Sequence, residues 1–295
     1  MKFIRAKHAG FCWGVRRAVE MAEASAVGSD GVVWTDGPLI HNRHEVERLA
    51  GRNIRECTDP GALVPGDSIL IRAHGIPPAR QAWFEERGLR VLDATCPNVR
   101  RIHRIVTEAI AAGEFVFVFG DTDHAEVIGI RGCCPADRVA TVSDAESGSA
   151  ETLGGFAFHF EEASVHLPPP ETTICLVSQT TQEEARFRQL ASLVQAHWPH
   201  TRVVQTICTA THDRQGDLDE LAASCDILVV VGSPSSANTG RLARLAAERC
   251  KTIVVDSAEG LHAGDFSGCS CVGITAGAST PEAVIAAVEQ RIAAF

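Results

Sequence analysis

The chain has 295 residues, of which 45% are hydrophobic and 22% are charged, so it can bury a substantial core and is not disordered. Its net charge is -10, and no Lys/Arg-rich block appears, which disfavours nucleic acid or an anionic membrane as the main partner. No segment approaches the roughly 20 apolar residues that cross a bilayer, and charges interrupt the first residues, so we expect a soluble, cytoplasmic protein without a membrane partner.

A recurring order of elements divides the chain into thirds. Each third is expected to begin with a short strand, followed by a cysteine and an amphipathic helix. The expected strands are 3–6, 90–95 and 203–207, and the expected helices are 15–24, 99–111 and 211–223. The cysteine of each third is Cys12, Cys96 or Cys208.

The remaining strands of each third follow in the same order. A second strand ends in a glycine-led loop: Gly37 to His41, Gly120 to His124, and Gly232 to Ser236. A third, short strand is expected at 53–55, 139–142 and 252–255. A fourth, at 68–72, 173–177 and 271–274, leads into another polar loop and then a closing helix that starts near Pro78, Gln182 and Pro281.

Strands that alternate with helices predict an α/β protein with mostly parallel sheets and helices on both faces. We expect three pseudo-three-fold-related α/β/α units at 1–89, 90–200 and 201–295. Residues 143–171 break the pattern and are expected to be a surface connection without chemistry. Ligands collect at the carboxyl ends of parallel strands, so the cysteine and polar loops are expected to surround one central cavity.

The eleven cysteines are an odd number with irregular spacing. In a cytosolic chain, metal binding or catalysis by a subset is a better interpretation than a disulfide framework. Most are expected to be inert core residues, a role that suits those in or beside apolar runs: Cys175, Cys225, Cys269 and Cys271.

Cys12, Cys96 and Cys208 each lie between a strand end and a helix start, where the helix dipole favours a thiolate. Zinc usually takes ligands in close local pairs, which these three do not form. Three thiolates without a fourth suit an iron–sulfur cluster with one open iron. Three unrelated core cysteines are the alternative interpretation.

Polar side chains recur at equivalent loop ends. Their convergence would form a donor-rich pocket for a phosphate or diphosphate, which offers acceptor oxygens. The candidates are His41, His74, His124, Thr180, Thr181, Ser236, Asn238 and Ser279. Glu126 would be the carboxylate of this ring, and it suits proton transfer, although an ordinary first-turn helix glutamate is the competing interpretation.

The sequence resembles the 4-hydroxy-3-methylbut-2-enyl diphosphate reductases along nearly its whole length. The motifs that carry the resemblance are Gly10-Phe11-Cys12, His41-Asn42-Arg43, Ala73-His74-Gly75, Asp93-Ala94-Thr95-Cys96-Pro97, His124-x-Glu126, Gln179-Thr180-Thr181, Ile207-Cys208-x-Ala210-Thr211, Arg214-Gln215 and Thr275-Ala276-Gly277-Ala278-Ser279. The resemblance lapses only in the 143–171 connection.

This resemblance implies an oxidoreductase of the methylerythritol phosphate route to isoprenoids. It implies a 4Fe–4S cluster on the three cysteines, with one iron not ligated by protein, to which the substrate hydroxyl binds. It also implies a diphosphate held by His41, His74, Ser236, Asn238 and Ser279, with His124 nearby. Glu126, helped by Thr180, would deliver protons, and a ferredoxin or flavodoxin would deliver electrons.

The sequence departs from the family pattern beside two motifs. Trp13 follows Cys12 where a small residue is usual, and its indole is expected to press on the cluster pocket or its access. Ala237 replaces the second hydroxyl of the usual Ser-Ser-Asn, so one diphosphate contact is missing. Three alternatives therefore stay open: a paralogous iron–sulfur reductase with another substrate, a non-enzymatic iron–sulfur sensor or binding protein, and, more distantly, a zinc hydrolase.

Overall fold

The computed structural model describes residues 1–27, 31–146, 151–162 and 164–295, which form two compact units. Unit 1 consists of Met1–Thr58 and Thr209–Phe295, and unit 2 consists of Asp59–Cys208. The predicted α/β class with mostly parallel sheets is confirmed. The division into three pseudo-three-fold units stays a prediction.

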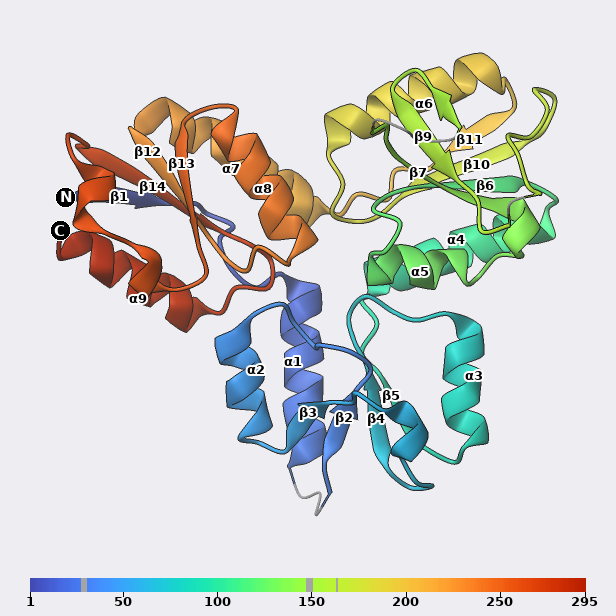
Figure 1. Cartoon of the computed structure of the whole chain (residues 1–295), viewed down its shortest axis with the longest axis horizontal. Helices are drawn as coiled ribbons and strands as arrows, with labels where there is room; N and C mark the ends of the chain where they lie inside the picture. The colour runs from blue at the N-terminus through green and yellow to red at the C-terminus, as the bar shows by residue number, and fades with distance from the viewer. Residues whose placement is uncertain (28–30, 147–150, 163) are drawn as a thin grey trace. The chain divides into compact units, whose positions relative to one another are not determined.

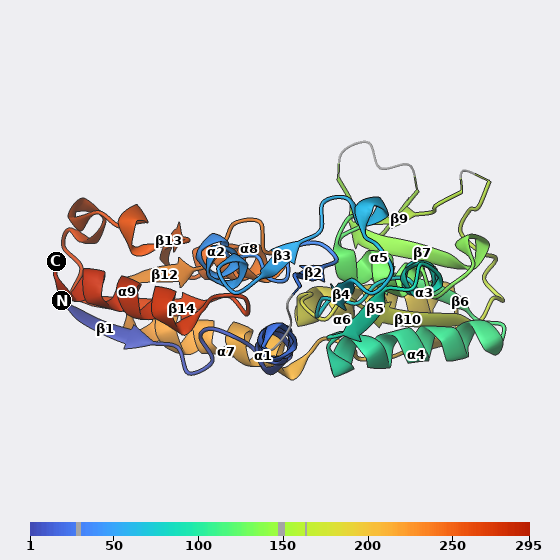
Figure 2. The same cartoon turned by 90° about the horizontal axis from the view of Figure 1, so that it is seen from below.

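The main sheet of unit 1 has four parallel strands in the order β1-β14-β12-β13. These strands are β1 (Lys2–Arg5), β12 (Ile227–Val231), β13 (Lys251–Val255) and β14 (Cys271–Ala276). Helices α7 (Thr209–Ser224) and α8 (Ala237–Ala247) cover one face, and α9 (Glu282–Ala293) covers the other (Figure 1). The two ends of the chain lie side by side at one end of this sheet (Figure 2).

The sequence of β12 explains why it is buried on both faces. Leu228 and Val230 pack in the cluster that contains the apolar side chains of α7 and α8. Ile227, Val229 and Val231 point to the opposite face and pack with those of α9. Because successive side chains of a strand alternate between the two faces, a strand covered on both sides is apolar throughout.

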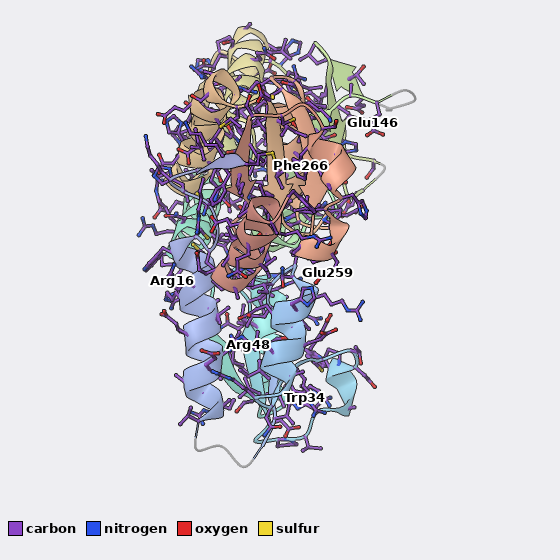
Figure 3. All side chains as sticks on the ribbon, turned by 90° about the vertical axis from the view of Figure 1, so that its left-hand side faces the viewer. Arg16, Trp34, Arg48, Glu146, Glu259 and Phe266 are labelled. Atoms are coloured by element: carbon purple, nitrogen blue, oxygen red, sulfur yellow. The ribbon has the colours of Figure 1, made fainter. Side chains whose placement is uncertain are left out.

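The remaining part of unit 1 carries a second, smaller arrangement. Strands β2 (Val33–Thr35) and β3 (Ile54–Glu56) pair in parallel, beside helices α1 (Trp13–Ala26) and α2 (Arg43–Ala50). Arg48 of α2 donates to Glu23 of α1 at 2.6 Å, and Figure 3 shows Arg48 on the side of α2 that faces α1. Two short 3₁₀ helices lie at Ala258–Gly260 and Ala263–Phe266.

The main sheet of unit 2 has the strand order β11-β10-β6-β7-β9-β8, in which the first four strands pair in parallel and β9 pairs antiparallel with both β7 and β8. They are β6 (Phe115–Phe119), β7 (Val139–Asp144), β8 (Thr152–Leu153), β9 (Phe156–His159), β10 (Ile174–Ser178) and β11 (Thr201–Val203). Helix α6 (Glu184–His197) covers one face, and α4 (Pro97–Ala111) and α5 (Ala125–Arg131) cover the other (Figure 1).

The phenylalanine–valine alternation of β6 sorts this core into two layers. Phe115, Phe117 and Phe119 pack on the α6 side, and Val116 and Val118 pack on the side of α4 and α5. Unit 2 also holds the parallel pair β4 (Ser68–Ile71) and β5 (Arg90–Asp93), helix α3 (Pro78–Glu86) and short 3₁₀ helices at Pro60–Ala62 and Ala136–Arg138.

The first strand of each predicted third pairs with the last strand of a different third. β5 pairs with β4, β11 pairs with β10, and β1 pairs with β14. The predicted boundaries at 90 and 201 therefore fall before strands that hydrogen-bond backwards along the chain. The strand expected at 203–207 is also shorter and earlier, since β11 spans Thr201–Val203 and residues 204–208 lead into α7.

The expectation that 143–171 is only a surface connection was wrong. The end of β7 and the strands β8 and β9 lie within it, and β9 pairs antiparallel with β7. Phe156 and Phe158 are buried against the α6 side of the sheet. Of the predicted connection, 147–150 and 163 lie outside the described residues. In the described part of the chain, helices are too short or too polar to cross a membrane.

Candidate functional site

Glu126 and Thr180 form a buried pair in unit 2. Glu126 lies in the first turn of α5 and is 2% exposed. Its Oε1 accepts a hydrogen bond from the backbone N–H of Thr180 at 2.6 Å, and its Oε2 accepts one from the Thr180 hydroxyl at 2.8 Å. Two donors from one residue fix the position and the plane of the carboxylate, as a proton-transfer group requires.

Thr180 also connects this pair to Cys208. The carbonyl oxygen of Thr180, which follows β10, accepts a hydrogen bond from the backbone N–H of Cys208 at 3.0 Å. The parallel pairing of β10 and β11 explains this proximity, because both residues lie beyond the carboxyl ends of these strands. Unit 2 therefore brings together the candidate proton donor and one candidate cluster ligand.

His74 and His124 contact each other edge to face. Their ring centroids are 5.3 Å apart with an interplanar angle of 78°. His124 is the N-cap of α5, and its Nδ1 accepts a hydrogen bond from the backbone N–H of Glu126 at 3.2 Å. In the neutral ring this bond leaves the proton on Nε2, which can donate to an anionic ligand.

Cys96 is the N-cap of α4, as the strand–cysteine–helix order predicted. Its backbone N–H donates to the carbonyl of Ala73 at 3.0 Å, so the Cys96 loop adjoins the loop that carries His74. Asp93 fixes the turn between β5 and α4, because its carboxylate accepts bonds from the Thr95 N–H at 2.8 Å and from Arg100 at 2.8 Å.

Gln179 positions the hydroxyl group of Thr181. This hydroxyl accepts a hydrogen bond from Nε2 of Gln179 at 2.8 Å, and Oε1 of Gln179 accepts one from the backbone N–H of Asp121 at 3.0 Å. These bonds connect the loops that follow β10 and β6, so the carboxyl ends of two neighbouring strands are held together.

Cys12 begins helix α1 in unit 1. It is the N-cap, and its Sγ accepts a hydrogen bond from the backbone N–H of Val15 at 3.4 Å. Its own backbone N–H donates to the carbonyl of Ala278 at 3.2 Å, which places Cys12 beside the loop that carries Ser279. Unit 1 thus brings the third candidate cysteine next to a candidate phosphate-binding loop.

Two residues of α7 hold the segment before Cys12. The buried guanidinium of Arg214 donates to the carbonyls of Gly10 at 2.5 Å and of Ala210 at 2.7 Å. The Asp217 carboxylate accepts bonds from the backbone N–H of His8 at 2.9 Å and lies 3.1 Å from its Nδ1. Gly10 has a φ of +96°, a left-handed conformation that favours glycine.

Ser236, Asn238 and Ser279 meet at the start of α8. Ser236 is the N-cap, and the Ser279 hydroxyl donates to its Oγ at 3.4 Å. Nδ2 of Asn238 is buried and has no hydrogen-bond partner among the described residues. An unpaired buried donor beside two hydroxyls at a helix N-terminus suits an anionic ligand with acceptor oxygens.

His41, the remaining candidate, lies one residue before the helix α2 cap. Asn42 is that N-cap, and its Oδ1 accepts from the backbone N–H of Glu45 at 3.0 Å. The two departures from the family pattern are also placed in unit 1. Trp13 is the first residue of α1 and is 61% exposed, so its indole is not part of the core, and Ala237 is the first residue of α8.

Among the described residues, His, Cys, Asp and Glu side chains do not gather in a group of three or more that could hold a metal ion. Cys12 belongs to unit 1, and Cys96 and Cys208 belong to unit 2, so their convergence stays a prediction. The donor set nevertheless fits an iron–sulfur cluster, because all three are half-buried thiols at helix starts.

Other cysteines have a different character. Burial raises the pKa of Cys133 to about 11, of Cys134 to about 12 and of Cys175 to about 11. Such thiols stay protonated and are poor cluster ligands, which supports the inert role expected of Cys175.

Two supporting residues, Asp217 and His103, were not predicted from the sequence. His103 lies on α4, and its ring packs against Gly75 and Gly129, where an added Cβ would meet ring atoms at 3.0 and 3.3 Å. The ring therefore fills the space between the loop after His74 and the helix that carries Glu126. Its position seven residues after Cys96, two helical turns away, was the available signal.

Known proteins resemble the chain over nearly its whole length. A family model described as LytB protein matches residues 3–293. A relative from Aquifex aeolicus, named 4-hydroxy-3-methylbut-2-enyl diphosphate reductase, is 38% identical over 98% of this chain and 95% of its own length. A relative of the same name from Solidesulfovibrio magneticus is 36% identical over 100% of both chains.

Two solved structures have the same fold. One, titled as the structure of (E)-4-hydroxy-3-methyl-but-2-enyl diphosphate reductase, the terminal enzyme of the non-mevalonate pathway, is 37% identical over 100% of both chains with a TM-score of 0.69. The other, titled as the E-1-hydroxy-2-methyl-but-2-enyl-4-diphosphate reductase from Plasmodium falciparum, is 23% identical with a TM-score of 0.84 and supports the fold alone. It covers 97% of this chain and 86% of its own.

Proposed function

The chain belongs to the LytB protein family, and we propose that it catalyses the reductive removal of the hydroxyl group of 4-hydroxy-3-methylbut-2-enyl diphosphate. The reaction consumes two electrons and two protons, releases water and gives isopentenyl and dimethylallyl diphosphate. The shared name of relatives that are 38% and 36% identical over nearly the whole chain supports this assignment.

Cys12, Cys96 and Cys208 hold a 4Fe–4S cluster in which one iron has no protein ligand. When bound, this cluster supplies electrons one at a time and a Lewis-acidic iron for the hydroxyl oxygen of the substrate. The positions of the three half-buried thiols at helix starts support this role. A ferredoxin- or flavodoxin-type protein supplies the electrons, and the reduced thiols suit the cytoplasm.

The bidentate contact between Glu126 and Thr180 is the observation that carries the proposal. The Glu126 carboxyl group transfers a proton to the reacting allyl group, and the Thr180 hydroxyl holds Oε2 in place. The bond from the Cys208 N–H to the Thr180 carbonyl connects this proton donor directly to a cluster ligand. Proton delivery and electron delivery therefore reach the substrate from adjacent residues.

The diphosphate binds donors from several strand ends. Its ligands are His41, His74, His124, Thr181, Ser236, Asn238 and Ser279. The buried Nδ2 of Asn238, which has no partner among the described residues, supports binding of an anion, and the positive end of the α8 dipole adds to this preference. The Nε2 proton of His124 adds a further donor.

Anaerobic reconstitution tests the proposal directly. We expect the purified chain to bind iron and sulfide and to convert the allyl diphosphate when a reduced viologen dye supplies electrons. Glu126→Gln is expected to retain its iron and sulfide and to lose turnover by a factor of about 100 or more. Cys96→Ser is expected to lose the cluster absorption, whereas Cys175→Ser retains it.

A second candidate, a paralogous reductase with another substrate, is favoured by Ala237, which leaves α8 without one expected hydroxyl. A full cluster with no turnover of the allyl diphosphate would support the paralogue. Full physiological output from Glu126→Gln would instead support a non-enzymatic iron–sulfur protein. Stoichiometric zinc without sulfide would overturn the cluster assignment.

A further inference from the structure

A second group of thiols lies at the end of the unit 1 sheet opposite to its candidate ligand loops. Cys225 precedes β12, and Cys271 is the first residue of β14, the neighbouring parallel strand. Ser236 and Ser279 follow the carboxyl ends of these same strands. The two cysteines are therefore separated from the proposed diphosphate site by the full length of the strands.

The sulfur atoms of Cys225 and Cys271 lie 3.4 Å apart, although 46 residues separate them in sequence. Both thiols are half-buried and neither takes part in a disulfide. A contact of this length has to shorten to the bonded S–S distance of about 2.05 Å when a disulfide forms. The expectation that both are inert core residues was therefore incomplete, because the sequence could not reveal that they touch.

Asp226 holds Cys271 at this position. Its Oδ2 accepts hydrogen bonds from the backbone N–H of Cys271 at 2.9 Å, from the N–H of Ser270 at 2.8 Å and from the Ser270 hydroxyl at 3.0 Å. These bonds lower the pKa of Asp226, the Cys271 N–H most of all. The backbone N–H of Asp226 in turn donates to the Cys271 carbonyl at 2.9 Å.

Gly273 leaves the space that Cys225 occupies. A Cβ on Gly273 would lie 3.3 Å from Sγ of Cys225 and 2.5 Å from Cδ2 of Leu228. The loop before β14 and the glycine within β14 thus position both sulfur atoms before any bond forms. Preorganisation of this kind removes part of the conformational cost of forming a bond between them.

We propose that Cys225 and Cys271 form a reversible disulfide when the protein meets hydrogen peroxide. The Cys271 thiolate attacks one peroxide oxygen, giving a sulfenic acid on Cys271 and releasing hydroxide. The Cys225 thiol then attacks the Cys271 sulfur, the S–S bond forms, and the hydroxyl leaves as water with the Cys225 proton. In total, two thiols lose two electrons and two protons, and one peroxide becomes two waters.

The raised pKa of Cys225 supports its role as the second thiol. Burial and the neighbouring Cys271 raise the pKa of Cys225 to about 12, so Cys225 stays protonated and acts as the second, resolving thiol. Cys250 lies close by, and its Sγ donates to the carbonyl of Asp226 at 3.3 Å and contacts the carbonyl of Cys225 at 3.7 Å, so its thiol proton points to backbone oxygens.

The bond would fasten the end of α7 to β14. Helix α7 carries Arg214 and Asp217, which hold the segment before Cys12. Oxidation would therefore restrict the movement of the helix that positions a candidate cluster ligand. Disulfides of cytosolic proteins are usually transient and redox-sensing, and this pair fits that class. The proposal does not depend on the enzymatic function.

Peptide mapping of the full-length protein tests the pair. The anaerobically purified protein is exposed to a few equivalents of hydrogen peroxide, blocked with N-ethylmaleimide, digested with trypsin and analysed by mass spectrometry. Cleavage after Arg214, Arg241, Lys251 and Arg291 places Cys225 and Cys271 on separate peptides, with Cys269 on the Cys271 peptide. We therefore include Cys269→Ser as the matched control.

We expect the two peptides to become linked in the wild type and in Cys269→Ser, and the link to disappear in Cys271→Ser and after dithiothreitol. Cys133 and Cys134 are expected to remain free for the maleimide. If Cys225 and Cys271 both carry maleimide after peroxide, or if Cys225 is linked to Cys250 or Cys269 instead, the proposal is overturned. Because the link between the two peptides is first measured in the wild type, and Cys269→Ser then assigns it to Cys271, the test does not depend on the folding of Cys271→Ser.

Discussion

The carboxylate of Glu126 accepts one hydrogen bond from the backbone of Thr180 and one from its side chain, at 2.6 and 2.8 Å. The backbone bond depends only on the course of the chain after β10, and the side-chain bond depends on the residue at 180. The two contributions can therefore be separated by substitution. Because both groups are buried, the carboxylate cannot replace a lost donor easily with water.

Thr180→Val removes the hydroxyl bond and keeps the backbone bond and the side-chain shape. We expect turnover of the allyl diphosphate to fall by roughly 10- to 100-fold, because the carboxyl group loses part of its orientation. Iron and sulfide contents are expected to be unchanged. Steady-state kinetics under anaerobic conditions give the comparison, with Thr180→Ser as the variant that keeps a hydroxyl. Equal rates for the valine and serine variants would contradict this role.

Because His103 packs against Gly75, the substitution Gly75→Ala is expected to lower the free energy of unfolding by more than glycine-to-alanine substitutions at open positions. Gly75 has a φ of +71°, and an added Cβ would lie 3.0 Å from Cε1 of His103 and 3.2 Å from Cγ2 of Thr95. Gly113 has a φ of +84° with nothing within 4 Å, so it isolates the conformational part of the cost. We expect Gly113→Ala to lower the free energy of unfolding by about 1 kcal/mol and Gly75→Ala by roughly 1–3 kcal/mol more.

A double-mutant cycle assigns that extra cost to the ring. In the background of His103→Ala the space beside Gly75 is open, so the Gly75→Ala penalty is expected to shrink towards that of Gly113→Ala. Urea unfolding of the four proteins of the cycle measures the difference. A penalty of the same size in both backgrounds would show that the overlap with His103 is relieved elsewhere.

His103 also predicts how stability depends on pH. Burial lowers the pKa of His103 from its usual 6.5, with Arg100 adding to the effect and Asp93 opposing it. Between about pH 6.5 and the lower folded-state pKa, the unfolded chain binds more protons than the folded one. The free energy of unfolding therefore falls as the pH drops through this range.

His103→Gln is expected to reduce the loss of stability on acidification below about pH 6.5. Urea unfolding at a series of pH values measures this slope. His200→Gln is the matched control, because His200 is exposed, and its slope is expected to equal that of the wild type. An unchanged slope in His103→Gln would mean that His103 titrates alike in both states.

The sequence predicted the positions of individual elements better than their partners. Cys12 and Cys96 are N-caps of α1 and α4, and Cys208 directly precedes α7, because a strand end followed by an amphipathic helix is a local signal. The pairing of β1 with β14 is not local, and periodicity does not state which parallel strand lies beside which. The predicted unit boundaries therefore separate strands that pair with each other.

The same limit explains the other differences. Phe156 and Phe158 alternate with other residues, as the side chains of one face of a strand do. The strand has only four residues and lies in a segment rich in Gly, Ser and Glu, so its periodicity was too short to predict it. The contact of Glu126 with Thr180 spans 54 positions, so the sequence supplied the two residues and only the fold supplies the bond between them. The contact between Cys225 and Cys271 is of the same kind.

Arg214 is expected to control loading of the proposed cluster through the Gly10 carbonyl. Its guanidinium donates to two carbonyls from a buried position, and a lysine ammonium cannot reproduce this planar fork. We expect Arg214→Lys to bind less iron than the wild type after reconstitution, while its far-ultraviolet circular dichroism stays unchanged. Arg249→Lys, which alters another arginine bound to a carbonyl of unit 1, is expected to load normally. Equal iron contents would contradict a role for this anchor.

Asn238 is expected to stabilise the bound diphosphate and to lower the free energy of unfolding of the ligand-free protein. Its buried Nδ2 lacks a partner among the described residues, and such an unsatisfied donor costs about 1–3 kcal/mol. Asn238→Ala is therefore expected to leave the free energy of unfolding of the ligand-free protein unchanged or higher. The affinity for inorganic diphosphate, measured by calorimetry, is expected to fall about 10-fold, which corresponds to about 1.4 kcal/mol.

Ser236→Ala is the contrasting variant, because Ser236 both caps α8 and lies beside Ser279. It is expected to lower stability by about 1 kcal/mol as well as affinity, since the cap is lost in the free and bound protein alike. The two substitutions thus separate a ligand-binding donor from a structural one. If Asn238→Ala destabilised the ligand-free protein as much as Ser236→Ala does, its amide would belong to the fold and not to the anion site.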